Sequence, residues 1–330
     1  MAINKEDYLY ISSLLRAREP RMLSRDKAER MLDTPSVQDA AKMLTDSGYE
    51  DMSQMSVKEI ENALSDKRAA VFHELETLVP NLAAIDLFRL KYDYHNVKVL
   101  IKSDAIHQND EKLLSSSGRI APEVILKRFN EDRLKDLPGE LGSAAEEAKG
   151  LLNRSANPQL SDFLLDKAYF RELAGLADEL ESDFARSYVA LQADSTNLRS
   201  VVRILRMGKD IGYLQEALVS GGSISEERLI SGISGEGIAS IFAGTPLEKA
   251  AQIGADAVSG GPLTAFELAC DNAVSAFLSD AKLCSFGEEC VLAYLAGTEN
   301  ELTAVRMILT GRLSGVPVDT IRERLRDLYA

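Results

Sequence analysis

The sequence of 330 residues contains no tryptophan, and only 6% of its residues are aromatic. A core must therefore come mostly from Leu, Ala, Ile, Val and Met. These residues suit packed helices better than sheets because, the β-branched ones apart, they are good helix formers. Hydrophobic residues make up an ordinary 45%, which argues against general disorder. The length allows two or three domains, or one elongated repeat body.

Basic residues are also scarce: 38 of them face 52 acids, which gives a net charge of −14. This balance argues against nucleic acid and anionic lipid as main partners, because phosphate binding needs an excess of Lys and Arg, although it leaves room for a local basic patch. The three cysteines form no CxxC pair, which favours buried thiols in a reducing compartment. No apolar run approaches the ~18 residues of a membrane span. Acids at Glu6 and Asp7 also break any signal-peptide pattern, so we expect no direct membrane insertion.

Nucleotide-binding and nucleophile motifs are missing as well. Gly208-Lys209-Asp210 lacks the upstream Gly and the Ser or Thr of a phosphate loop. The run 232–237 follows no strand, and Glu236 stands where a nucleophile elbow needs Gly. We interpret that run as a flexible helix connection.

Residues for metal or acid–base chemistry are not grouped either. His73, His95 and His107 lack partners at helical spacing, and the acids at 178–181 do not form a paired-aspartate motif. Therefore we predict no catalytic residue, no cofactor and no metal site.

What is present is helical periodicity from end to end. A first helix is expected from near Asn4, and a second after Pro35 that stops at Gly48. A long helix is expected over 159–192, and a last one after Pro317. Because alternating strand segments are absent, the predicted fold class is all-α.

Three landmarks recur in the same order along the chain. The first landmark is an apolar residue followed by a small residue, any residue and an acid. It occurs at Leu23-Ser24-Arg25-Asp26, Ile120-Ala121-Pro122-Glu123 and Ile224-Ser225-Glu226-Glu227. The second occurs at Asp66-Lys67, Asp166-Lys167 and Asp271-Asn272. The third is an Asn followed five residues later by a β-branched residue and a base, at Asn96, Asn197 and Asn300. The asparagines lie 101 and 103 residues apart, so the spacing is nearly constant.

These landmarks predict three similar helical units, in which the three asparagines are repeat-defining structural residues. The predicted divisions are an N-terminal helix (1–17), repeat one (18–112), repeat two (113–215) and repeat three (216–330). The alternative is that helical proteins in general share such capping acids and Asn–base pairs, because helix-start signals are common.

A stripe of basic residues follows the third landmark. It comprises Lys98 and Lys102 in repeat one, and Arg199, Arg203 and Arg206 in repeat two. On an acidic protein, such a stripe could face the acids of a partner, which makes these five residues candidates for an interface. The alternative is that bases near a helix C-terminus only offset its dipole.

The sequence resembles the C subunit of the V/A-type ATPases, in the family that includes the d subunit of eukaryotic V-ATPases. The strongest local match is residues 89–102, RLKYDYHNVKVLIK, which carries an aromatic–Asp–x–x–Asn–aliphatic–basic run similar to that of the family. Leu14-Leu15-Arg16, Leu23-Ser24, Ser117-Gly118-Arg119-Ile120 and Asp194-Ser195-Thr196-Asn197-Leu198-Arg199 also look like the family. The resemblance covers nearly the whole chain and is weakest over 219–262.

This resemblance implies three helical units arranged as a funnel with pseudo-threefold symmetry. It implies a non-catalytic rotor component of the central stalk, cytoplasmic and peripheral to the membrane, present as one copy per complex. The implied partners are the D and F subunits of the shaft and the proteolipid subunits of the membrane rotor ring. The implied role is to transmit torque between ATP chemistry and ion transport. An unrelated all-helical scaffold is the alternative.

Overall fold

The protein is described by a computed structural model that covers residues 3–235 and 237–330, so Glu236 lies outside the described residues. The chain is all-helical, with 73% of residues in helices and no strand among the described residues. It forms two compact units. We call Met1–Ile85 with Thr264–Ala330 the terminal unit, and Asp86–Leu263 the middle unit.

The terminal unit is built from both ends of the chain. Its helices are α1 (Leu9–Arg18), α2 (Arg25–Asp33), α3 (Val37–Lys42), α4 (Val57–Glu76), α14 (Leu263–Ser279), α15 (Glu288–Leu313) and α16 (Val318–Arg322). Its 3-10 turns are η1 (Lys5–Tyr8), η2 (Glu19–Arg21), η3 (Thr45–Ser47) and η6 (Asp280–Leu283). Helix α15 packs against α1, α2, α3, α4 and α16. It is apolar around much of its circumference, as expected of a helix at the centre of a core.

One hydrophobic cluster joins these helices. Leu23, Met31 and Leu44 from the N-terminal part are almost fully buried together with Val305 and Ile308 of α15. Hydrophobic burial is worth roughly 25 cal/mol for each Å² of apolar surface removed from water. The N-terminal segments and α15 therefore depend on each other for their core.

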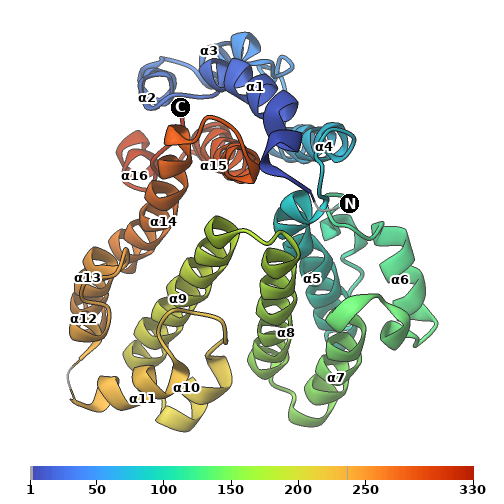
Figure 1. Cartoon of the computed structure of the whole chain (residues 1–330), viewed down its shortest axis with the longest axis vertical. Coiled ribbons are helices and arrows are strands. Elements are labelled where there is room, and N and C mark those ends of the chain that lie inside the picture. Colours follow the sequence, from blue (N-terminus) through green and yellow to red (C-terminus); the bar gives the residue numbers. More distant parts are fainter. Residues whose placement is uncertain (1–2, 236) are drawn as a thin grey trace. The chain divides into compact units, whose positions relative to one another are not determined.

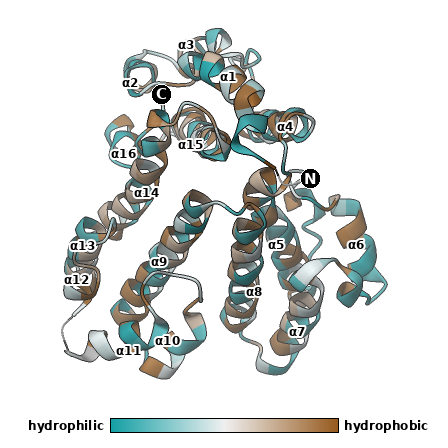
Figure 2. Cartoon of the chain, viewed as in Figure 1, coloured by the Kyte–Doolittle hydropathy of each residue, from teal (hydrophilic) through white to brown (hydrophobic). Residues whose placement is uncertain are grey.

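The middle unit contains the other helices and two short turns. They are α5 (Ala83–Ala105), η4 (Glu111–Leu113), α6 (Pro122–Asn130), η5 (Leu134–Asp136), α7 (Gly139–Ser155), α8 (Pro158–Glu179), α9 (Asp183–Arg206), α10 (Ile211–Ala217), α11 (Glu226–Gly235), α12 (Ile238–Ile241) and α13 (Glu248–Val258). Helices α7 and α8, and α8 and α9, pack as consecutive pairs, and α13 packs on α9 (Figure 1). Hydrophobic and hydrophilic residues mix along α8 and α9, which have neighbours on some sides and solvent on others (Figure 2).

The structure bears out a buried face of the first predicted helix and only part of the second. Tyr8, Ile11 and Leu15 of the first helix are all buried. The helix predicted from Pro35 to Gly48 is shorter than expected, because α3 ends at Lys42. The separate 3-10 turn η3 ends at Gly48, whose φ of +75° is the left-handed conformation typical of a helix C-terminus.

The single long helix predicted over 159–192 is wrong. The chain leaves α8 after Glu179, and Glu181 adopts a φ of +52°. The Ser182 side chain then caps α9 by accepting a hydrogen bond from the Ala185 N–H at 3.2 Å. A capping serine thus breaks the periodic pattern into two helices. The all-α prediction is confirmed, whereas the three repeat boundaries stay a prediction.

Candidate functional site

An aspartate and an asparagine on α5 bind the segment that follows this helix. Asp93 is fully buried, and its Oδ1 accepts a hydrogen bond from the Ile120 N–H at 3.0 Å. The Asn96 side chain donates to the Ser115 carbonyl at 2.9 Å and accepts from the Ser115 N–H at 2.7 Å. The two side chains thus provide partners for main-chain groups that no helix pairs. We call them, with residues 115–120, the first clamp.

The same pair of residue types recurs on α9. Asp194 Oδ1 accepts a hydrogen bond from the Ile224 N–H at 3.2 Å. The Asn197 side chain donates to the Val219 carbonyl at 2.9 Å and accepts from the Val219 N–H at 2.8 Å. We call Asp194 and Asn197, with residues 219–224, the second clamp. Asn96 and Asn197 therefore make the same pair of main-chain hydrogen bonds in two places.

The two clamps provide different partners for the second carboxylate oxygen of their aspartates. Arg119 Nε donates to Asp93 Oδ2 at 2.9 Å, and its Nη2 donates to Glu172 Oε1 on α8 at 2.7 Å. Burial raises the pKa of Asp93, while Arg119 and the main-chain donors oppose that rise. In the second clamp, Asp194 Oδ2 accepts instead from both the N–H and the hydroxyl of Ser223. A neutral side chain thus replaces a cation.

Each clamp also requires a glycine. A Cβ atom on Gly118 would lie 2.2 Å from Asp93 Oδ1, and one on Gly222 would lie 2.2 Å from Asp194 Oδ1. No real Cβ contact is that short, so any larger residue must displace a hydrogen-bonded carboxylate. The close approach of segment and helix explains both glycines.

The third asparagine behaves differently. Asn300 on α15 donates to the Ser275 hydroxyl at 2.9 Å. Its neighbour Glu301, only 6% exposed, accepts from the Leu23 N–H at 2.8 Å and from the Tyr49 hydroxyl at 2.6 Å. Burial raises the pKa of Glu301. On α15 a glutamate thus binds the main chain at the start of the first landmark, and Asn300 does not.

The predicted basic stripe is engaged within the middle unit. Lys98 pairs with Asp166 and Lys102 with Asp162, each at 2.6 Å. The lysine side chains remain 23% and 42% exposed, respectively. Burial raises the pKa of Asp166, and Lys98 opposes this shift. The acids of α8 therefore already compensate both lysines.

The arginines of the stripe are also engaged. Arg199 Nη1 donates to the Ser195 hydroxyl at 2.7 Å, and Arg203 has interactions of its own. Arg206 Nη1 donates to the Ala257 carbonyl at 3.0 Å and to the Gly261 carbonyl at 2.6 Å. Arg206 therefore binds one carbonyl near the C-terminal end of α13 and another in the segment that follows it. The role of these five residues at an interface stays a prediction.

Sequence reasoning gave a structural role to the asparagines of both clamps. It placed Asp93, Asp194 and Gly118 only in runs that resemble the family, and it missed Gly222. The signal was present, because Asp93 and Asp194 each stand three residues before the clamp asparagine. Glu301 had no such signal, since its partners Leu23 and Tyr49 lie more than 250 residues away in sequence.

Histidines, thiols and acids are the side chains that could carry metal or acid–base chemistry. Among the described residues, no group of three or more His, Cys, Asp and Glu side chains is arranged to hold a metal ion. The three histidines are exposed. Of the thiols, Cys270 and Cys290 are buried and Cys284 is partly buried. Within residues 3–235 and 237–330, every helix is too short or too polar to cross a bilayer.

Comparison with known proteins places the chain in a family. The family model described as ATP synthase (C/AC39) subunit matches residues 11–324. The C subunit of the V-type sodium ATPase of Enterococcus hirae is 24% identical, with 98% of this chain and 99% of the relative covered. The C subunit of the A-type ATP synthase of Methanocaldococcus jannaschii is 23% identical, with 99% and 88% covered. The C subunit of the V-type ATP synthase of Thermus thermophilus is 24% identical over 62% of this chain and 65% of its own. The chain therefore belongs to the ATP synthase (C/AC39) subunit family, whose members are non-catalytic, peripheral subunits of V/A-type ATPases.

Proposed function

We propose that this protein is the central-stalk socket of a V/A-type rotary ATPase. In this role it links the shaft, formed by the D and F subunits, to the proteolipid subunits of the membrane rotor ring. It turns with the rotor, as one copy on the cytoplasmic face, and transmits torque between ATP hydrolysis or synthesis and ion transport. The observation that carries the proposal is the family match over residues 11–324.

The clamps support a mechanical role. A torque-bearing body must resist sliding between its helices and the segments that connect them. Each clamp fixes a connecting segment to a long helix through at least three hydrogen bonds, two from Asn and one or more from Asp. Because a partner lost from a buried polar group costs about 1–3 kcal/mol, such joints resist opening. Three helical units around a central opening remain part of this proposal.

Co-purification tests the proposed role. The chain is co-expressed with the D and F subunits of the shaft and captured through a tag on the chain, over a series of salt concentrations. We expect a stable 1:1:1 complex that weakens with salt, because exposed charges are screened within ~10 Å at 0.1 M salt. A folded chain that captures no shaft at low salt would contradict the proposal and favour an unrelated scaffold.

The predicted stripe can be tested with internal controls. Lys102→Glu removes a possible contact with a partner, and Asp162→Asn removes the internal partner of Lys102. If Lys102 meets acids of a partner, the lysine variant weakens capture of the shaft or ring while the aspartate variant leaves it intact or tighter. Equal weakening by both variants would show that only the internal ion pair matters.

A further inference from the structure

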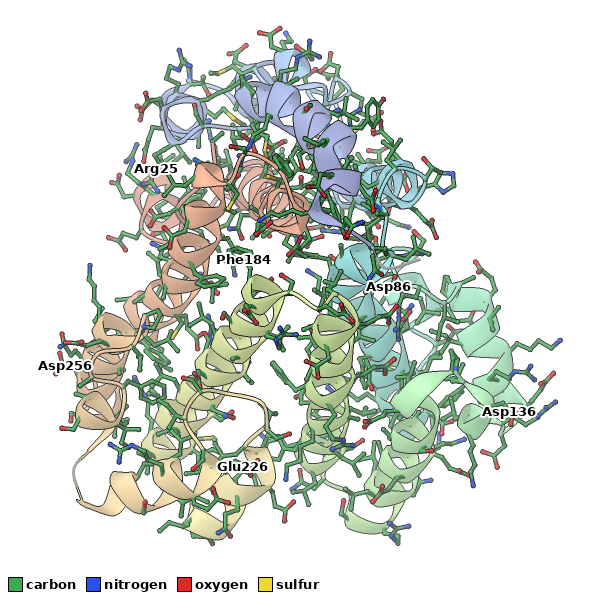
Figure 3. All side chains as sticks on the ribbon, viewed as in Figure 1. Arg25, Asp86, Asp136, Phe184, Glu226 and Asp256 are labelled. Carbon is green, nitrogen blue, oxygen red and sulfur yellow. The ribbon has the colours of Figure 1, made fainter. Side chains whose placement is uncertain are left out.

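Two adjoining pockets of the terminal unit form one groove. The first, of about 560 Å³, is lined by η2, α2, Lys282 and the C-terminal residues. The second, of about 510 Å³, extends to α4 and α15. They share Arg21, Met22, Asp46 and Ser47, so they are continuous. We call the two pockets together the basic groove. Its place along α2 can be found in Figure 3 from the label of Arg25, which is the first residue of α2 and follows the lining residue Ser24.

Six cations line this groove on a chain whose net charge is −14. They are Arg18, Arg21, Lys27, Arg30, Lys67 and Lys282. Arg18 pairs with Glu74. Arg21 and Arg30 are exposed, and their side chains form no hydrogen bond or ion pair with any other residue that the structure describes. Their charges are therefore available to a ligand.

The three lysines of the groove donate hydrogen bonds only to neutral groups. Each ammonium group donates to an oxygen that carries no net charge, so the hydrogen bond itself does not compensate the charge. Glu301 attracts Lys67 and Lys27 electrostatically, whereas Lys282 has no acidic partner among the described residues. The acceptors are the Ser47 hydroxyl for Lys27, the Gly48 carbonyl for Lys67 and the Tyr329 carbonyl for Lys282.

The acidic side chains of the groove are fewer than its cations. Glu19 is bound by Arg16 and by the Tyr329 hydroxyl. Glu301 is buried, accepts hydrogen bonds from Leu23 and Tyr49, and partly offsets the charges of Lys67 and Lys27. Asp46 remains, at the junction of the two pockets. The groove therefore keeps an excess of positive charge.

We propose that the basic groove binds an acidic segment of a partner protein, extended along both pockets. The cations are spread over two pockets and have Asp46 between them, which disfavours one compact phosphate. A nucleic acid is disfavoured because its long run of negative charge would meet a chain whose net charge is −14. This surface is distinct from the stripe of Lys98, Lys102 and the three arginines, so the inference does not require the socket role.

Binding of a defined acidic probe tests this inference. A fluorescein-labelled oligoglutamate of about eight residues, which can extend to roughly 25 Å, is titrated with the full chain. Fluorescence anisotropy reports its Kd, with an oligoglutamine of equal length as control. We expect Arg21→Glu with Arg30→Glu to raise the Kd at least about tenfold, because like charges at the site oppose an acidic ligand.

Matched variants separate the groove from net charge. Lys112→Glu with Arg154→Glu makes the same charge change at exposed bases of the middle unit outside both pockets. This variant should change the Kd by less than about threefold, as expected of distant screened charges. If the charge reversal prevents folding, the double variant Arg21→Gln with Arg30→Gln replaces it and should also raise the Kd.

Some outcomes would overturn the inference. Equal loss of binding in the groove and control variants would mean attraction to net charge alone. Tighter binding of inorganic phosphate or a single-stranded oligonucleotide than of the peptide would assign the groove to another ligand. Capture of the D and F subunits is measured separately, so failure of the socket proposal and failure of this inference remain distinguishable.

Discussion

The first and second clamps hold their segments with the same geometry but compensate their acids by different chemistry. In both, an Asp and an Asn three residues apart bind the main chain, and a glycine lies against the aspartate. In the first, Arg119 joins Asp93 to Glu172. In the second, Ser223 donates to Asp194. The comparison teaches that main-chain geometry is the shared element, while the compensating side chain differs.

Removal of the side chain that compensates the aspartate should give the largest difference in stability between the two clamps. We expect Arg119→Ala to lower the free energy of unfolding by about 3–4 kcal/mol, because it leaves the buried Asp93 carboxylate without its cation. Ser223→Ala should cost only about 1 kcal/mol, since the Ser223 N–H still donates to Asp194. Urea denaturation followed by circular dichroism measures both. Equal losses would mean that the cation is unimportant.

Removal of the clamp asparagines should have the next largest effect. Asn197→Ala leaves the buried N–H and carbonyl of Val219 unpaired, so we expect a loss of about 3 kcal/mol. Asn96→Ala should cost about half as much, because Ser115 is only partly buried and water can replace the amide. Asn300→Ala, which loses one bond to a hydroxyl, is the control. If Asn300→Ala lowers the free energy of unfolding as much as Asn197→Ala does, the stabilisation is not specific to the clamp asparagines.

Addition of one methyl group tests the part that the clamps have in common. Gly118→Ala and Gly222→Ala should each lower the free energy of unfolding by about 2 kcal/mol, because the new Cβ meets an aspartate oxygen. Gly175→Ala is the matched control: Gly175 lies within α8, with no atom near its Cβ position. That variant should stabilise the protein by about 0.5–1 kcal/mol. Unequal losses at 118 and 222, measured in urea, would show that the clamps differ in packing.

The glutamate on α15 should give the smallest and most pH-dependent effect. Because burial raises its pKa above the ordinary 4.5, the folded chain binds this proton more tightly than the unfolded chain. The contribution of Glu301 to stability is therefore greatest at low pH and declines as the pH rises from 4.5 through the folded pKa. Glu301→Gln removes this titration.

Urea denaturation from pH 4.5 to 8 measures the difference between Glu301→Gln and the wild-type chain. The stability of the variant relative to wild type should rise with pH over this window. Glu50→Gln makes the same substitution at an exposed position and serves as the control for the change itself. A flat difference for Glu301→Gln would contradict a raised pKa.

Local sequence signals predicted the helical class and the equivalent asparagines. The side-chain pairs between helices depend on long-range contacts that the sequence does not show. Periodicity gave the all-α class, and Gly48 marked a helix end through its backbone conformation. The spacing of Asn96 and Asn197 indicated equivalent positions. The sequence did not reveal that Lys98 and Lys102 pair with α8, because which helix faces which is decided by packing. The break at Ser182 was missed because its cap lies inside a pattern that is periodic on both sides.

The terminal unit joins residues from both ends of the chain, and this has a consequence for protein synthesis. Its core unites α2 and α3 with α15, and Glu301 binds Leu23. Ribosomes add about 5–20 residues per second, so the first 85 residues wait roughly 10–50 s for α15 to be made. The middle unit is complete before then. Apolar residues such as Met31 and Leu44 must stay out of aggregates during this interval, which makes the nascent N-terminal segment a natural client for chaperones.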